Sequence, residues 1–290
     1  MTSPAEQRAA GAPAISLLVC TRDRETQLRR FLAALPVTEI RAAAAELVLV
    51  DNASADGSLA LLESFAADSG LDVRVLAEPR PGKSLALNRG IDATRAPLVA
   101  FTDDDCYLGA GYLATALAEF ASGSFQYAGG RIVLHDPSDS RIATNYSTRR
   151  RLLAPGSFLR AGLIQGANMV VSRAVFERIG GFDAALGPAT RFRCEDIDLC
   201  ARASAAGFTG AYLPSLLVHH HHGRKAGPGT EALKQANAHG RGAYYAKRIR
   251  AGDWNYLAGW IGRSLAPWRL RFVPQELRGA REYWQAAGDP

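Results

Sequence analysis

The segment Phe101-Thr102-Asp103-Asp104-Asp105-Cys106 ends a short apolar run that begins at Ala96. The run has the length of a buried strand, and three carboxylates follow it at once. Carboxylates packed this closely repel one another unless a cation lies between them or water solvates them fully. Because open α/β sheets bind ligands at strand ends, the segment predicts a site for a hard cation, Mg²⁺ or Mn²⁺, beside a phosphate-bearing substrate. A solvated acidic turn is the alternative.

Apolar runs alternate with helix-spaced apolar residues over the first third of the chain. The expected strands are 15–20, 46–50, 72–76 and 98–101, and the expected helices are 25–35, 58–65 and 84–94. This alternation is typical of a parallel α/β sheet, and unbroken apolar strands agree with burial on both faces. Later segments predict helices over 110–120, 173–179 and 195–206 and strands over 126–134 and 212–218.

The composition of the 290 residues is that of an ordinary globular protein, 48% hydrophobic and 21% charged. No apolar run approaches the roughly 20 residues of a membrane span. Residues 1–13 lack the apolar core of a secretory signal, so we expect a flexible leader. The four cysteines show neither zinc-ligand spacing nor a disulfide framework, which favours a reducing cytoplasm.

The net charge of +6 arises from the C-terminal tail, residues 223–290. Residues 223–290 hold twelve Lys/Arg and five Asp/Glu, whereas residues 1–222 hold 22 and 23. This imbalance favours an anionic partner such as a membrane surface or a lipid phosphate, with a merely basic, soluble surface as the alternative. No nucleic-acid-binding motif accompanies the charge, so we expect no nucleic acid to bind.

Two polar motifs suit a nucleotide. Asp51 follows the strand 46–50, where an acid can accept hydrogen bonds from a base or a ribose, or simply cap the turn. Lys83 follows Pro81-Gly82 and opens a helix, where close backbone approach and positive charge favour a diphosphate. The spacing is not that of a P-loop, and a plain helix start is the alternative.

Two later motifs suit catalysis and metal binding. Glu195-Asp196-Ile197-Asp198 places three acids in one helical turn, either as partners of the helix dipole or with one of them directed into a cleft as a base. His219-His220-His221-His222 follows an apolar strand. If that strand continues, His219 and His221 share one face and could bind Mn²⁺, and a solvated loop is the alternative.

Taken in order, these segments resemble the family 2 glycosyltransferases, nucleotide-sugar enzymes of the GT-A fold. The matching segments are 16–24, 47–58, 82–90, 103–105, 166–169, 180–183 and 195–199. The resemblance implies an α/β GT-A domain over 14–225, with a mixed central sheet flanked by helices. Its Rossmann-like nucleotide-binding half would end near residue 106, and its acceptor half would follow. Residues 226–290 would form a basic, aromatic helical extension.

The resemblance also implies roles at a donor site. Asp103 and Asp105 would hold the divalent ion on the donor diphosphate, with Asp104 as the alternative register. His219 or His221 would complete the shell of that ion. The residues expected to contact the nucleotide-sugar donor, a UDP-sugar by expectation, are Thr21, Arg22, Asp51, Asn52, Lys83, Asp103, Asp104, Gly166 and Asn168.

For catalysis, the resemblance implies that Asp196 deprotonates an acceptor hydroxyl, with Glu195 as the fallback. One base without a protein nucleophile implies a single displacement with inversion at the anomeric carbon. The acceptor would be a saccharide, a lipid-linked molecule or another alcohol, as in polysaccharide or glycolipid assembly. Residues 136–160 and the tail would form its side of the cleft.

The aromatic and basic residues of the tail allow two interpretations. The four tail tryptophans either belong to a core or, mixed with arginines, form an amphipathic helix at the inner face of the cytoplasmic membrane.

Two other functions are considered. A nucleotidyltransferase would need a glycine-rich loop after the first strand, and residues 21–25 lack glycine. A non-catalytic carbohydrate-binding relative is the other alternative, and the intact acids Asp103, Asp105 and Asp196 argue against it.

Overall fold

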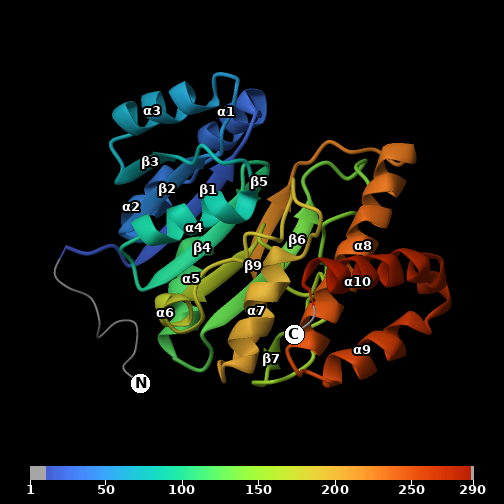
Figure 1. The fold of residues 1–290 in the computed structure, drawn as a ribbon. Coiled ribbons are helices and arrows are strands. Elements are labelled where there is room, and N and C mark those ends of the chain that lie inside the picture. The colour runs from blue at the N-terminus through green and yellow to red at the C-terminus, as the bar shows by residue number, and fades with distance from the viewer. Residues whose placement is uncertain (1–10, 289–290) are drawn as a thin grey trace.

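A nine-stranded mixed sheet organises the computed structural model of the chain, which describes residues 11–288 (Figure 1). The strands are β1 (Ile15–Thr21), β2 (Ala45–Asp51), β3 (Val73–Ala77), β4 (Leu98–Asp103), β5 (Cys106–Leu108), β6 (Tyr127–Leu134), β7 (Arg151–Leu153), β8 (Met169–Ser172) and β9 (Gly210–His220). Their order in the sheet is β3-β2-β1-β4-β8-β6-β9-β5, and β7 also pairs with β9.

Helices cover both faces of this sheet (Figure 1). They are α1 (Glu25–Ala33), α2 (Val37–Ala42), α3 (Ser58–Asp68), α4 (Lys83–Ala93), α5 (Tyr112–Ala121), α6 (Arg173–Ile179), α7 (Glu195–Ala205), α8 (Pro228–Arg250), α9 (Asn255–Ser264) and α10 (Val273–Ala286), with a 3₁₀ turn η1 (Pro267–Phe272) before α10. Among the described residues, no helix is both long and apolar enough to cross a bilayer.

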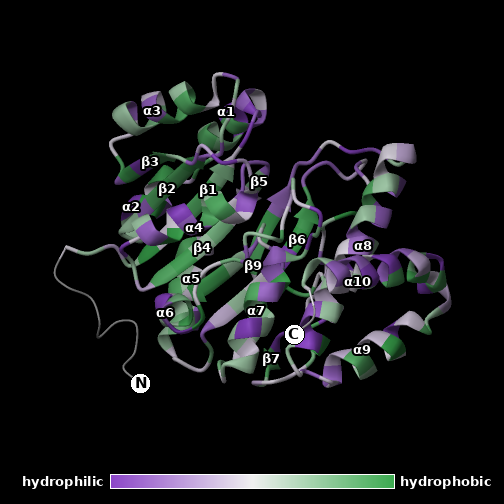
Figure 2. Cartoon of the chain, in the orientation of Figure 1, coloured by the Kyte–Doolittle hydropathy of each residue, from purple (hydrophilic) through white to green (hydrophobic). Residues whose placement is uncertain are grey.

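The parallel part of the sheet brings polar strand ends together. β3, β2, β1 and β4 run parallel, and their register pairs Thr21 with Asp51 and Cys20 with Asp103. Strands in this register end side by side, so the residues after them share one edge. β1, β2 and β4 are buried along nearly their whole length because helices cover both faces of the sheet, and they are largely green in Figure 2. The edge strand β3 is only partly buried and includes Arg74.

The second part of the sheet runs in mixed directions. β8 is antiparallel to both β4 and β6, while β6 is parallel to β9 with an irregularity after Gly130. The short strand β5 pairs antiparallel with β9 and sets Cys106 opposite His220. This pairing carries the acidic turn to the end of the histidine run.

Two hydrophobic cores lie on opposite faces of the sheet. Leu17 and Leu18 are both fully buried, but alternation along β1 sends Leu17 into one core and Leu18 into the other. The second core also includes Tyr244, Tyr245 and Tyr256 from the C-terminal helices. Those helices therefore share a core with the strands.

Two glycines allow α10 to lie directly against α8. A Cβ built on Gly242 would lie 1.7 Å from the carbonyl oxygen of Glu276, and one built on Gly279 would lie 1.9 Å from that of His239. Backbone meets backbone at both points, so no side chain can move aside. The close crossing of these helices depends on the two missing methyl groups.

The predicted fold class is confirmed, and most elements begin and end within two or three residues of their expected positions. The sequence did not predict α2, β5, β7 and β8, which have three to six residues each. Segments this short are defined by their tertiary partners rather than by periodicity. Most of the expected leader, residues 1–10, lies outside the described residues.

Replacing Gly242 with alanine should lower the free energy of unfolding by about 1–3 kcal/mol, because the added methyl group overpacks the crossing of α8 and α10. Gly262→Ala in α9 is the matched control, since a Cβ there meets nothing within 4 Å. It should be neutral or stabilising, by up to about 1 kcal/mol. Urea denaturation measures both variants, and equal stabilities would contradict the predicted close packing.

Candidate active site

A single cavity of about 1290 Å³ runs along the polar strand ends and reaches the C-terminal helices. It is lined by most of the residues that the sequence singled out: Thr21, Arg22, Asn52, Lys83, Asp103, Asp104, Asp105, Gly166, Glu195 and Asp196. Residues far apart in the chain thus share one space. The expected metal, diphosphate and base residues lie on its walls together.

Asp104 points inward and holds the acidic turn to the first strand. Its side chain is buried, accepts a hydrogen bond from the Thr21 hydroxyl (2.6 Å) and forms an ion pair with Arg24 (3.2 Å). Burial raises the pKa of Asp104 to about 6, although Arg24 and Thr21 oppose the shift. These partners give Asp104 a structural role in the turn.

Asp105 lies between Arg24 and His220. Arg24 donates to it at 2.6 Å, and the His220 Nε2 atom is 3.3 Å away. Burial opposes ionisation, but His220 and Arg24 outweigh it and hold the pKa of Asp105 well below its usual range. Asp105, Cys106 and His220 each offer a ligand atom, and these atoms lie within 4.8 Å of one another.

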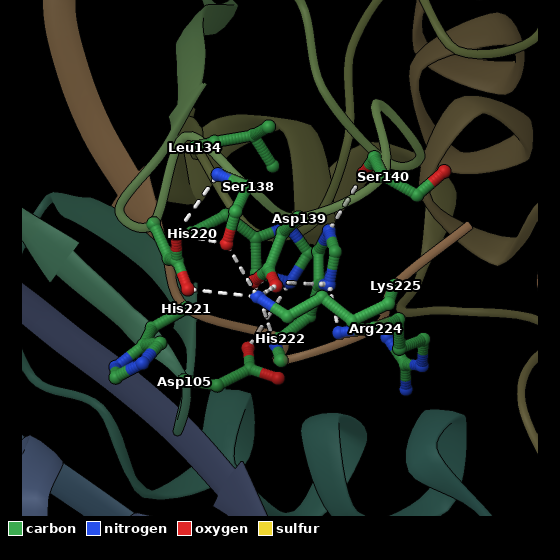
Figure 3. A network of polar contacts seen from close by, with 12 residues as sticks. Asp105, Leu134, Ser138, Asp139, Ser140, His220, His221, His222, Arg224 and Lys225 are labelled. Atoms are coloured by element: carbon green, nitrogen blue, oxygen red, sulfur yellow. Dashed lines mark hydrogen bonds and ion pairs between the residues drawn. The ribbon is translucent and has the colours of Figure 1, made fainter.

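The histidine that faces the aspartates is His220. Leu216 and Val218 are fully buried on β9, and His220 continues their face. His221 instead bonds to the Tyr107 hydroxyl (3.0 Å) and points away from the cluster in Figure 3, while His219 is only partly buried. The expectation that His219 and His221 face the carboxylates is therefore corrected by one residue, because the pairing of Cys106 with His220 fixes the register.

A polar network fixes the end of β9 in this register (Figure 3). Lys225 donates to Asp139 (2.6 Å) and to Ser138 (2.7 Å), and the His222 Nε2 atom bonds to the Ser140 carbonyl (3.1 Å). These bonds fasten the loop after β6 to the residues after β9. The network therefore holds the residues that follow His220 in place.

Lys83, Asp103 and Gly166 form the next part of the wall. Lys83 is ion-paired with Asp103, and this charge together with Glu195 holds the pKa of Lys83 above its usual range although burial opposes it. A Cβ on Gly166 would lie 3.9 Å from the Lys83 amine and 3.8 Å from the Asp196 Cβ. The lysine, the glycine and Asp196 are therefore immediate neighbours.

Glu195 and Asp196 start α7 and differ in their environments. Burial and the charge of Asp196 raise the pKa of Glu195 to about 7, with Lys83 opposing. Burial also raises the pKa of Asp196, although the backbone N–H groups of Gly166 (2.9 Å) and Ile197 (2.7 Å) donate to its carboxylate. Two adjacent carboxyl groups with raised pKa values in a cleft are typical of a general base.

The third acid of this turn has a structural role. Asp198 is fully buried and accepts hydrogen bonds from Arg202 and Lys247, each at 2.9 Å. Lys247 belongs to α8, so Asp198 joins α7 to the C-terminal helices.

Three predicted donor residues have internal partners. Asn168 does not line the cavity, since its amide donates to the carbonyls of Arg131 and Leu216 (both 2.9 Å) within the sheet. The expectation that Asn168 lies beside the donor sugar is therefore corrected, because its side chain lies within the sheet and outside the cavity. Asn52 lines the cavity, but its side chain bonds to the backbone of the 78–82 loop. Asp51 does not line the cavity: it is buried, one carboxylate oxygen accepts from the Ser54 N–H (3.1 Å), and the other has no partner among the described residues.

Sequence reasoning gave no role to Arg24 and to the arginines further along the cavity. Arg24 bridges Asp104 and Asp105, although it lies some 80 residues earlier in the chain. The only sequence signal was its position in the loop after the first strand. The other arginines come from separate segments, and no local pattern links them: Arg141, Arg160, Arg193, Arg224, Arg241 and Arg269.

The family model described as Glycosyltransferase like family 2 matches residues 13–242. The chain belongs to this family. A pre-mycofactocin glycosyltransferase of Mycobacterium tuberculosis is 29% identical over 160 residues, covering 52% of this chain and 33% of that protein. Glycosyltransferase AglE of Haloferax volcanii is 23% identical over 92% of this chain and 86% of its own length. The uncharacterized protein y4gI of Sinorhizobium fredii is 27% identical, and the chain spans only 28% of its length.

Solved structures with the same fold confirm the GT-A architecture. The mannosyltransferase PcManGT of Pyrobaculum calidifontis, in complex with GDP-Man and Mn²⁺, superposes with a TM-score of 0.67 at 20% identity and covers 100% of this chain and 79% of that one. TarS 1-349 of S. aureus, in complex with UDP-GlcNAc, gives 0.63 at 16% identity over 95% of this chain and 82% of that one.

Replacing Arg24 with glutamine should lower the free energy of unfolding by about 1–3 kcal/mol at neutral pH, because two buried carboxylates lose a shared cation. Arg29→Gln is the control, since its ion pair with Glu25 is exposed and should contribute under about 1 kcal/mol. Urea denaturation at pH 7.5 compares the two. A loss no larger than that of the control would show that Arg24 is not needed to offset the acids.

Proposed function

We propose that the protein transfers a sugar from a nucleoside-diphosphate sugar to an acceptor hydroxyl, in one displacement that inverts the anomeric carbon. One observation carries this proposal: a pair of carboxyl groups with raised pKa values, Glu195 and Asp196, lies in one cavity with Lys83 and the aspartate turn. A base beside a cationic diphosphate site is what such a displacement needs. The printed names and bound donors of the relatives agree with it.

The donor end would be built around Lys83 and Asp51. The amine of Lys83 supplies a positive charge for the diphosphate at the N-terminus of α4. The unpartnered oxygen of Asp51 can only accept a hydrogen bond, which favours a base with a ring N–H, such as uracil or guanine, or a ribose hydroxyl. We propose a UDP-sugar as the donor, bordered by Thr21, Arg22 and Gly166.

The residues at the aspartate turn fit a divalent cation. Asp105 and His220 offer an oxygen and a nitrogen 3.3 Å apart, and Asp103 adds a carboxylate on the same turn. Mn²⁺ accepts both kinds of ligand, and the neighbour that binds GDP-Man also holds Mn²⁺. Cys106 is the third group of this cluster, and its soft sulfur suits Mn²⁺ less well than a carboxylate or an imidazole does. A bound ion would stabilise the charge of the leaving diphosphate.

Asp196 is the proposed base, with Glu195 as the alternative. The acceptor oxygen forms its bond to the anomeric carbon while its proton passes to the carboxylate. The bond between that carbon and the donor diphosphate breaks, and the diphosphate departs with its electrons towards Lys83. Burial favours this proton transfer because it raises the basicity of the carboxylate.

The C-terminal extension presents an apolar outer surface. Its exposed large side chains are Trp254, Leu257, Ile261, Leu265, Trp268, Leu270, Leu277 and Trp284. Among the four tryptophans, all of which the structure describes, Trp260 alone turns inward and donates to Glu276 at 2.7 Å. Exposed arginines accompany the apolar residues on η1 and α10. We propose that this surface attaches the protein to an anionic cytoplasmic membrane face and that the acceptor is lipid-linked, in polysaccharide or glycolipid assembly.

Replacing Asp196 with asparagine should reduce the transfer rate by about 10²–10⁴-fold and leave donor affinity unchanged, because only the proton acceptor is removed. In the unaltered protein the rate should fall as the pH drops, since burial raises the pKa values of Glu195 and Asp196 and protonation of this pair removes the base. Donor binding by calorimetry and initial rates measure these effects. Asp92→Asn, on the exposed side of α4, is the control, and undiminished turnover of Asp196→Asn would refute its role.

Replacing Leu265 and Trp268 together with serine should weaken binding to vesicles of phosphatidylglycerol and phosphatidylcholine by about tenfold or more, because both apolar groups would stay in water. Leu152→Ser removes an exposed leucine from β7, outside this surface, and this variant should bind as the unaltered protein does. Vesicle co-sedimentation compares the three proteins. Equal binding would exclude this surface as the attachment site.

A further inference from the structure

Five arginines gather where the cavity meets the C-terminal helices. Arg160, Arg193, Arg241 and Arg269 line the cavity, and Arg263 lies close enough to affect the charge of Arg160. They come from three separate regions: the loop after β7, the residue before the α7 N-cap, and the C-terminal helices. No expected donor group needs this many cations, since Lys83 and the aspartate turn lie elsewhere in the cavity.

One carboxylate serves this cluster, and its hydrogen bonds are already used. Glu276 is 1% exposed and accepts from Arg241 (2.9 Å), Arg269 (3.1 Å) and the Trp260 indole. Within residues 11–288, the side chains of Arg160, Arg193 and Arg263 form no ion pair or hydrogen bond. The buried Nε atoms of Arg263 and Arg269 likewise have no acceptor among these residues.

This arrangement is electrostatically unfavourable in the molecule alone. Burial and then the neighbouring arginines lower the pKa of both Arg160 and Arg263. A structural role accounts for Arg241 and Arg269, which hold Glu276 between α8 and η1. It does not account for Arg160 and Arg193, whose side chains are partly buried yet bind nothing among the described residues.

The backbone on either side of Arg160 is held firmly in place. The hydroxyl of Tyr244 donates to the Leu159 carbonyl (2.9 Å), and that of Tyr256 accepts from the Leu159 N–H (3.2 Å). The Tyr245 hydroxyl accepts from the Ala161 N–H (3.3 Å). Three tyrosines from α8 and α9 thus position Arg160 against its like-charged neighbours, which is the preorganisation that an anion site requires.

The cluster also lies near the proposed base. Arg193 precedes Cys194, the residue that caps α7 directly before Glu195 and Asp196. Arg241 and both acids influence the charge on the Cys194 thiol, so they surround the same residue. A group bound by these arginines would therefore belong to the molecule whose hydroxyl the base activates.

We propose that Arg160, Arg193 and their arginine neighbours bind an anionic group of the acceptor, a phosphate or a carboxylate. This inference rests on the proposed transfer reaction and names the substrate class for its second site. Guanidinium groups match the paired oxygens of both anions, which neutral sugars lack. The anion would supply the countercharge that the cluster lacks among the described residues.

The test uses the full chain, saturated with UDP and Mn²⁺ to occupy the donor end. Calorimetry then measures binding of farnesyl phosphate, inorganic phosphate and glucuronate, with farnesol as the uncharged comparison. The variant carries Arg160→Gln and Arg193→Gln together, and Arg178→Gln, an exposed arginine at the end of α6, is the matched control. Thermal unfolding without ligand should show the double variant at least as stable as the unaltered protein, because a repulsion is removed.

We expect saturable binding of at least one of the three anions, weakened about tenfold or more in the double variant and unchanged in Arg178→Gln. Preference for farnesyl phosphate over both inorganic phosphate and farnesol identifies a lipid phosphate. Equal binding of inorganic phosphate identifies a soluble phosphorylated acceptor, and preference for glucuronate identifies an acidic sugar. Absence of saturable binding of all three, or equal affinity in the double variant, overturns the inference.

The same experiment separates this inference from the proposed function. If UDP and Mn²⁺ fail to bind, the proposed transfer reaction fails, and the anion titration without them still tests the arginines through the difference between variants. If the donor binds and none of the anions does, only the acceptor inference fails.

Discussion

Three consecutive carboxylates at the end of β4 must each be offset by a partner, and the rest of the site is arranged around that requirement. Asp103 is paired with Lys83, Asp104 with Arg24 and Thr21, and Asp105 with Arg24 and His220. These partners lie on α4, on β1 and the loop after it, and on β9. The ion pairs and hydrogen bonds that offset the three aspartates therefore also join the parallel part of the sheet to its mixed part. Groups that relieve repulsion in the free protein are also those that a bound cation and a diphosphate would rearrange.

Charge changes sign along the cavity, and this change matches the two substrates of the proposed reaction. The aspartate turn and Lys83 suit a metal-bound diphosphate, whereas the arginines beside the C-terminal helices suit an anion on the other substrate. Glu195 and Asp196 lie between these charges, buried enough to hold protons more tightly than free carboxylates do. A base in that position lines the same cavity as the groups proposed to bind the two substrates.

Local patterns predicted the parts of this protein that depend on strand ends, and they missed what depends on register or on distant segments. Asp103 and Lys83 meet because parallel strands and the helices after them share one edge, which periodicity reveals, whereas the place of Asp196 in the same cleft was implied by the family resemblance. His220 was missed by one residue, since only pairing with the three-residue strand β5 decides which histidine faces inward. Asn168 looked like a ligand residue, but its amide holds sheet carbonyls that no sequence pattern locates. The arginine cluster joins three segments that only the tertiary structure brings together.

The C-terminal helices connect the arginine end of the cavity to an apolar surface on the outside of the molecule. Gly242 and Gly279 bring α10 onto α8, and this contact fixes Glu276, which in turn holds Arg241. The inner face of the extension thus carries the arginines, while its outer face exposes Leu265 and Trp268. Both faces belong to the same closely packed helices, so a displacement of one face would also move the other. Attachment of the outer face to a membrane would place the helices that carry the arginines at the lipid surface, and the same packing would hold the arginines in place for a phosphate borne by a lipid.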